Sequence, residues 1–101
     1  MAGLILRLWI GLVSIAENFA DLCDYFITIN EPQCVVGLGH LSAVHAPGVR
    51  HTITDTFRIA HNLLKAHGQA VINLRKYAGR PIKVGYAPTG GVAYPYTDSP
   101  E

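Results

Sequence analysis

Apolar residues run through the first part of the chain in a helical pattern. From Leu4 to Phe19 or Leu22, polar or small residues recur every three to four positions, which predicts a packed helix with one narrow polar stripe. Residues Met1 to Ala16 also have the basic start and small-x-small end of a secretory signal peptide. A signal peptide needs no such stripe, so we favour the packed helix. The apolar run is too short to span a bilayer.

A strand should follow this helix. Residues 25–29 (Tyr-Phe-Ile-Thr-Ile) are aromatic or β-branched and nearly continuously apolar, which predicts a strand buried on both faces, as in a parallel sheet. Pro32 has no N–H group to donate to a neighbouring strand. The strand should therefore end near Asn30 or Glu31.

The second half of the chain predicts a loop, a helix and another strand. Glycines, prolines and histidines over residues 37–51 indicate a long irregular loop. Thr52 to Asp55 has the form of a capping box, and a helix from there should end near Tyr77, with Gly79 just beyond it. One face of this helix should carry Phe57, Ala60, Leu64, His67, Val71 and Leu74.

Residues 82–86 (Ile-Lys-Val-Gly-Tyr) predict a second short strand, so the chain reads as a β-α-β unit of an α/β protein. Two parallel strands cannot cover their own faces or edges. The pattern therefore indicates part of a larger α/β body, without internal repeats.

Composition narrows the possible partners of the 101-residue chain. Half of the residues are hydrophobic and 15% are charged, which argues against intrinsic disorder. The net charge is +1 and the positive charges are scattered, so nucleic acid is not indicated as a partner. We also expect no membrane partner, because the apolar run is short. Cys23 and Cys34 stand a strand apart and should be free, mostly buried thiols, which fits a reducing cytoplasm. The five histidines match no zinc-binding spacing, so we expect no metal site.

Glu31 is the strongest candidate for chemistry because it stands where a buried strand would emerge into a glycine-rich loop. In a (β/α)8 barrel, active sites assemble at the carboxyl ends of the strands. A carboxylic acid at that place can act as a general acid, and the Asn30 amide offers both a donor and an acceptor to a sugar hydroxyl. By spacing alone the motif stays ambiguous, because a glutamate before proline is also typical of a turn.

The residues around this motif resemble a known family. Residues 26–32 (Phe-Ile-Thr-Ile-Asn-Glu-Pro) are similar to the acid/base signature of family 1 glycoside hydrolases, the β-glucosidases and their relatives. The resemblance covers roughly Phe19 to Glu101 and follows the family's order. Its further segments are residues 37–40, 45–48, 61–67, 82–85 and 97–101.

The resemblance implies a fold and an activity. Residues 1–101 would form a fragment of a (β/α)8 TIM barrel, about two of its βα units, without a separate second domain. The family hydrolyses O-glycosyl bonds of β-glycosides or small oligosaccharides with retention of configuration, and it needs no metal or organic cofactor. Glu31 would be the acid/base, protonating the leaving oxygen and then activating water, and Asn30 would bind the sugar 2-hydroxyl.

Retention needs a second carboxylate about 5–5.5 Å from the first. Neither Glu17 nor Glu101 lies in a context that resembles the family's nucleophile, so we expect the chain alone to be inactive. Gln33 and Cys34 follow the motif where many family members carry an aromatic residue. The alternative is a non-catalytic half-barrel that self-associates through its unpaired strand edges.

Overall fold

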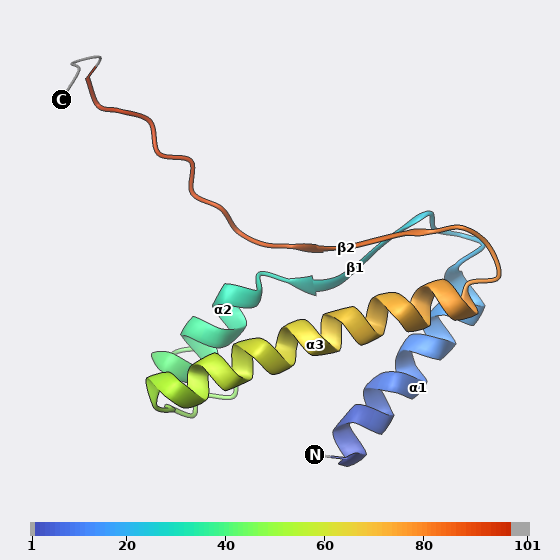
Figure 1. Ribbon diagram of the computed structural model, residues 1–101, viewed down its shortest axis with the longest axis horizontal. Helices are drawn as coiled ribbons and strands as arrows, with labels where there is room; N and C mark the ends of the chain where they lie inside the picture. Colours follow the sequence, from blue (N-terminus) through green and yellow to red (C-terminus); the bar gives the residue numbers. More distant parts are fainter. Residues whose placement is uncertain (1, 98–101) are drawn as a thin grey trace.

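The structure is a computed structural model that describes the backbone of residues 2–97 and the side chains of residues 11–97. Met1 and residues 98–101, including Glu101, lie outside the described residues. The elements follow in the order α1 (Ala2–Phe19), β1 (Tyr25–Asn30), α2 (Pro32–Val36), the π-helical turn η1 (Gly37–Leu41), α3 (Ile53–Tyr77) and β2 (Lys83–Ala87) (Figure 1). The predicted long helices and both strands are confirmed, with ends that shift by one or two residues. No helix among the described residues is long and apolar enough to cross a membrane.

The prediction of an irregular loop over residues 37–51 is wrong for residues 37–41. Pro32 opens α2 as a first-turn residue, where its missing N–H would have had no partner inside the helix. Helical backbone then continues through Leu41. Gly39 is buried in this turn, and a Cβ atom added to it would lie 2.9 Å from the Ala46 carbonyl oxygen, so only glycine allows this close backbone approach.

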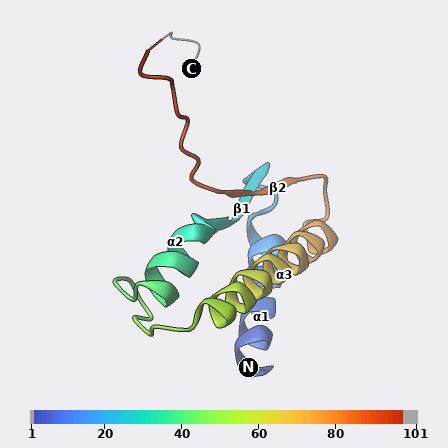
Figure 2. The ribbon, with the colours of Figure 1, turned by 60° about the vertical axis from the view of Figure 1, so that its left-hand side comes forward.

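The two strands form a parallel pair joined through α2, η1 and α3. Ile27 pairs with Gly85, but the register then shifts, and Asn30 pairs with Ala87. In Figures 1 and 2 the strands form one layer and α1 and α3 form a second layer on one side of them. The chain is thus a β-α-β unit with an extra helix before it.

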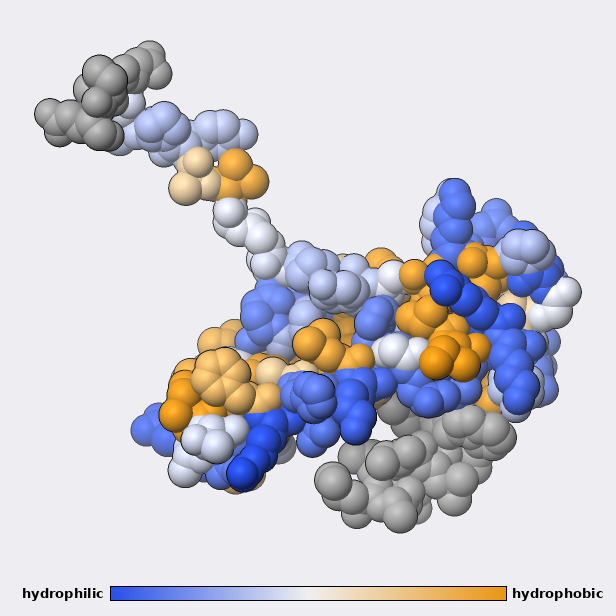
Figure 3. All heavy atoms as spheres, viewed as in Figure 1, coloured by the Kyte–Doolittle hydropathy of each residue, from blue (hydrophilic) through white to orange (hydrophobic). Residues whose placement is uncertain are grey.

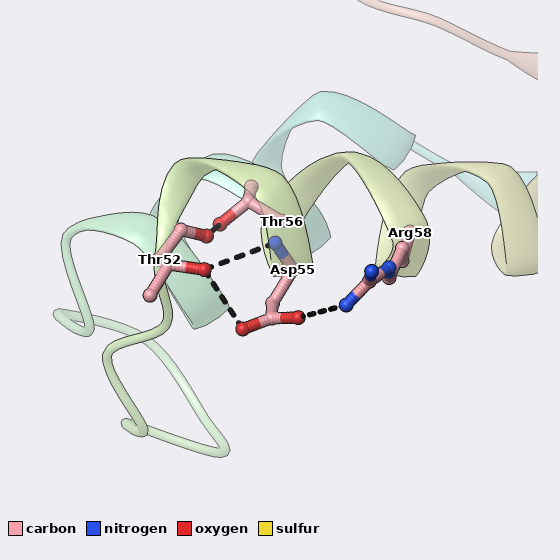
Figure 4. A network of polar contacts seen from close by, with 4 residues as sticks. All are labelled: Thr52, Asp55, Thr56 and Arg58. Carbon is pink, nitrogen blue, oxygen red and sulfur yellow. Dashed lines mark hydrogen bonds and ion pairs between the residues drawn. The ribbon is translucent and has the colours of Figure 1, made fainter.

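The ends of α3 follow the predicted capping pattern. The Thr52 side chain accepts a hydrogen bond from the Asp55 N–H at 3.2 Å and donates one to the Asp55 carboxylate at 2.7 Å (Figure 4). The hydrogen bond from Thr52 is the main cause of the lowered pKa of Asp55. A hydrogen bond of 2.8 Å from Arg58 lowers this pKa further. After Tyr77 the chain turns away at Gly79, whose φ of 67° is in the left-handed region that glycine favours.

The hydrophobic core is small and lies between α1 and α3. Its buried hydrophobic residues, among those described, are Ala16, Ala20, Ala70 and Leu74. The expectation that strand β1 is buried on both faces is wrong, since Ile27 is 66% exposed, and Phe57 on α3 is 71% exposed. Two strands and two long helices cannot cover each other completely, and hydrophobic surface stays open over α2 and the N-terminal half of α3 (Figure 3).

The radius of gyration, 17.4 Å, exceeds the roughly 13 Å of a compact domain of this length.

Both cysteines are free, as predicted, but they are not buried as expected. Cys23 is exposed on the turn before β1 and Cys34 is half-buried in α2. The same turn is tied to the start of β2, because Arg80 contacts the Asp24 carboxylate and the Ala20 carbonyl oxygen. These contacts fix the amino ends of the two strands, opposite the end that carries Glu31.

Candidate functional site

Glu31 lies directly after β1, at the carboxyl end of the parallel pair. Its N–H group donates a hydrogen bond of 2.8 Å to the carbonyl oxygen of Ala87, the last residue of β2. The backbone of Glu31 is therefore held by the neighbouring strand. This confirms the expected placement of the residue at the carboxyl edge of a sheet.

The conformation of Glu31 is unusual for a residue with a side chain. Its φ of 45° and ψ of 62° are left-handed, a region in which a Cβ atom is strained. Glu31 also occupies the N-cap position of α2, and its carbonyl oxygen accepts from the N–H groups of Cys34 at 2.9 Å and Val35 at 3.3 Å. Its side chain makes no capping hydrogen bond. The exposed carboxylate thus does not cap the helix and is open to other chemistry.

Asn30 precedes Glu31 as the last residue of β1 and is exposed. The register shift brings Asn30 opposite Ala87, the same residue that binds the Glu31 N–H. The two predicted site residues are therefore fixed by one position of β2. The side chain of Gln33, on the first turn of α2, adds a hydrogen bond of 3.4 Å to the Thr89 carbonyl oxygen in the segment after β2.

Cys34 is a neighbour of Glu31 whose contact the sequence analysis missed. Partial burial of the thiol, hydrogen bonding to the Glu31 side chain and the negative charge of that side chain all raise the pKa of Cys34. The thiol is therefore held in its neutral form beside the carboxylate. The signal in the sequence is that Cys34 follows Glu31 by three positions. Residues at this spacing come into contact when they lie in a helix, and Glu31 begins one.

A polar network supports the site from the helical side of the sheet. The Thr28 hydroxyl lies 2.6 Å from His67 Nδ1 and 3.2 Å from the Gly85 carbonyl oxygen. A carbonyl oxygen only accepts, so the single hydroxyl proton goes to Gly85 and His67 Nδ1–H donates to Thr28. The His67 ring also lies 5.1 Å from the Tyr86 ring. The network joins β1, β2 and α3 where the register shifts.

The loop histidines form no recognisable metal site. The rings of His40 and His51 lie 5.3 Å apart, and the His51 N–H donates to the His40 carbonyl oxygen. His40 Nδ1 is buried without a hydrogen-bond partner. Within residues 2–97, no three histidine, cysteine, aspartate or glutamate side chains gather closely enough to hold a metal ion.

The carboxylates other than Glu31 lie elsewhere in the described part of the chain. Glu17 is on α1, Asp21 and Asp24 are on the turn before β1, and Asp55 is engaged in the α3 cap. The site therefore presents one exposed carboxylate with an adjacent amide. That arrangement can transfer a proton and bind a hydroxyl, which is one half of a two-carboxylate mechanism.

Comparison with known proteins gives a consistent result. The family model "Glycosyl hydrolase family 1" matches residues 13–101. Beta-glucosidase A of Thermotoga maritima is 42% identical over 85 residues, which cover 84% of this chain and 19% of that protein. Beta-glucosidase 13 of Arabidopsis thaliana is 36% identical over 98 residues, which cover 84% of this chain and 19% of that protein.

Solved structures agree with the sequence matches. The family 1 β-glucosidase of Thermotoga maritima superposes with a TM-score of 0.78 at 37% identity, over 97% of this chain and 21% of that chain. The same protein in complex with glucoimidazole gives a TM-score of 0.80, and the superposition covers 97% of this chain and 22% of that chain. The chain thus spans about a fifth of the length of the relatives it matches.

Proposed function

The chain belongs to glycosyl hydrolase family 1, and on that basis we propose that it carries the acid/base half of a retaining β-glucosidase site. Its fold is a piece of that family's TIM barrel, with two parallel strands and three helices rather than a closed barrel. The observation that carries the proposal is the place of Glu31. Its N–H is bound to Ala87 at the carboxyl edge of the strands, while its carboxylate is exposed and free of capping.

In the proposed mechanism Glu31 acts twice. It first gives its proton to the glycosidic oxygen as the bond to the sugar breaks and a carboxylate from another part of the barrel attacks the anomeric carbon. It then takes a proton from a water molecule, which attacks the glycosyl-enzyme and releases the sugar. Asn30 binds the 2-hydroxyl, a contact that strengthens as positive charge develops on the ring.

The substrate class in this proposal is a β-glycoside. It is supported by the relatives, which include β-glucosidases and a 1,4-β-D-glucan glucohydrolase of Thermotoga neapolitana. The chain contributes about two of the eight βα units that a barrel contains. We propose that the second carboxylate comes from the remaining units and that the 101-residue chain alone does not hydrolyse glycosides.

The experiment places the chain where a complete site can form. Residues 13–101 replace the matching segment of Thermotoga maritima β-glucosidase A, and the chimera is assayed on an alkyl β-glucoside. We expect Glu31→Gln to lower kcat/KM by about 10²–10⁴-fold, the usual contribution of a general acid or base. The isolated chain, assayed in parallel, should show no turnover.

Glu17→Gln serves as the matched control, because Glu17 is an exposed carboxylate on α1 that has no part in the mechanism. This variant should leave the activity of the chimera unchanged. An active chimera that tolerates Glu31→Gln would disprove the role of Glu31. Turnover by the isolated chain, abolished by the same substitution, would disprove the need for a second carboxylate from elsewhere.

A further inference from the structure

Strand β1 contains one extra residue directly before the candidate site. Ile27 lies opposite Gly85 and Asn30 lies opposite Ala87, so β1 advances by three residues where β2 advances by two. In regular pairing, Ile29 rather than Asn30 would lie opposite Ala87. An extra residue of this kind is a β-bulge, which bends the strand and changes the direction of the side chains that follow it.

The exposure of the side chains agrees with this insertion. Helices α1 and α3 lie on one side of the sheet, and from Tyr25 to Thr28 exposed and half-buried residues alternate along β1 (Figures 1 and 2). Strict alternation would make Ile29 exposed and Asn30 half-buried, but Ile29 is half-buried and Asn30 is exposed. The extra residue therefore turns Asn30 away from α3, to the open face of the sheet that Tyr25 and Ile27 share.

A side-chain contact with α3 holds the bulged stretch. Thr28 lies within this stretch, and its hydroxyl accepts a hydrogen bond of 2.6 Å from His67 Nδ1–H on α3. The same hydroxyl donates to the Gly85 carbonyl oxygen of β2 at 3.2 Å. The His67 ring also lies 5.1 Å from the Tyr86 ring on β2. The imidazole thus fixes Thr28 against both α3 and β2 where the strand pairing changes.

We propose that His67 is a positioning residue for glycoside cleavage: through Thr28 it holds the bulge that presents the Asn30 amide on the open face of the sheet. The proposal rests on the proposed function, in which Asn30 binds the sugar 2-hydroxyl. His67 lies on the helical side of the sheet and does not touch the sugar. Its effect on the reaction should therefore depend on the hydroxyl group that Asn30 binds.

The first measurement uses the full 101-residue chain. Cross-strand nuclear Overhauser effects in NMR distinguish Asn30 opposite Ala87 from Ile29 opposite Ala87. In His67→Leu the ring donor is lost, so we expect the contact of Ala87 to move from Asn30 to Ile29. His67→Asn can donate from the place of Nδ1 and should keep the contact with Asn30. An unchanged contact between Asn30 and Ala87 in a His67→Leu chain, shown by circular dichroism to be folded, would overturn the proposal.

The second measurement uses the chimera with Thermotoga maritima β-glucosidase A. It compares the dinitrophenyl glycosides of β-glucose and 2-deoxy-β-glucose, whose departing group needs no proton from Glu31. The ratio of kcat/KM for the two substrates measures the contribution of the 2-hydroxyl. We expect Asn30→Ala and His67→Leu each to lower this ratio at least about tenfold, because a hydrogen bond to the 2-hydroxyl is lost. His67→Asn should stay within about threefold of the parent ratio.

His61→Leu is the matched control, because His61 is an exposed histidine on the same helix. It should change neither the NMR contact nor the ratio. A lower rate on both substrates with the parental ratio in His67→Leu would overturn the proposal, because the histidine would then act through stability alone. A parental ratio in Asn30→Ala would instead refute the 2-hydroxyl contact of the proposed function, and the positioning role of His67 would fall with it.

Discussion

Glu31 shows at the residue scale what sequence patterns can and cannot predict. The strand before it and Pro32 after it were enough to place the carboxylate at the end of β1. Its left-handed backbone, its place as the N-cap of α2 and the hydrogen bond from its N–H to Ala87, far along the chain, could not be predicted from the strand pattern. The contact with Cys34 was missed because it forms only when Glu31 begins a helix.

The strain at Glu31 gives a prediction about stability. Glycine adopts a φ of 45° without a Cβ penalty, so Glu31→Gly should raise the free energy of unfolding by about 1 kcal/mol. Urea denaturation of the isolated chain, followed by far-UV circular dichroism, measures the change. Glu31→Gln keeps the Cβ atom and should differ from the parent by less than about 0.5 kcal/mol. Equal stability of the glycine and glutamine variants would contradict the strain.

At the scale of the elements, the register shift in β1 sets the direction of Asn30 and Glu31. The apolar pattern of residues 25–29 predicts a strand but carries no information on this shift. Thr28 lies within the shifted stretch and bonds to Gly85 in the other strand and to His67 in the helix. Such a network is visible only when the three elements are assembled.

Thr28→Val tests that network. The substitution keeps the β-branched shape but leaves His67 Nδ1 and the Gly85 carbonyl oxygen without the hydroxyl, at a cost of about 1–2 kcal/mol. We expect lower stability and faster exchange of the Glu31 amide proton, measured by NMR. Thr28→Ser keeps the hydroxyl and should preserve the slow exchange. Unchanged exchange in Thr28→Val would mean that the register is set by other contacts.

The cap of α3 predicts how stability depends on pH. The lowered pKa of Asp55 means that its ionised form is stabilised in the folded chain, so its contribution is present above its ordinary pKa of 3.8. That contribution is lost as the pH falls through the lower pKa of the folded state. In thermal unfolding, Asp55→Asn should therefore show a smaller loss of stability on acidification than the parent chain. An identical acid dependence would show that Asp55 makes no such contribution.

At the scale of the whole molecule, the order of elements was predictable and their burial was not. Periodicity placed α1, α3 and both strands because these depend on local pattern. The expected burial of Ile27 depends on neighbours that the described residues do not provide, and Ile27 is exposed. The small core and the large radius of gyration agree with a chain that corresponds to a fifth of its relatives.

The most direct test of the account compares two substrates in the chimera with Thermotoga maritima β-glucosidase A. An alkyl β-glucoside needs a proton on its departing oxygen, whereas a dinitrophenyl β-glucoside leaves readily without one. If Glu31 is the general acid, Glu31→Gln should slow bond cleavage in the alkyl substrate by about 10²–10⁴-fold and affect cleavage of the dinitrophenyl substrate far less. Equal losses of the cleavage rate for both substrates would contradict the assignment of Glu31 as the acid.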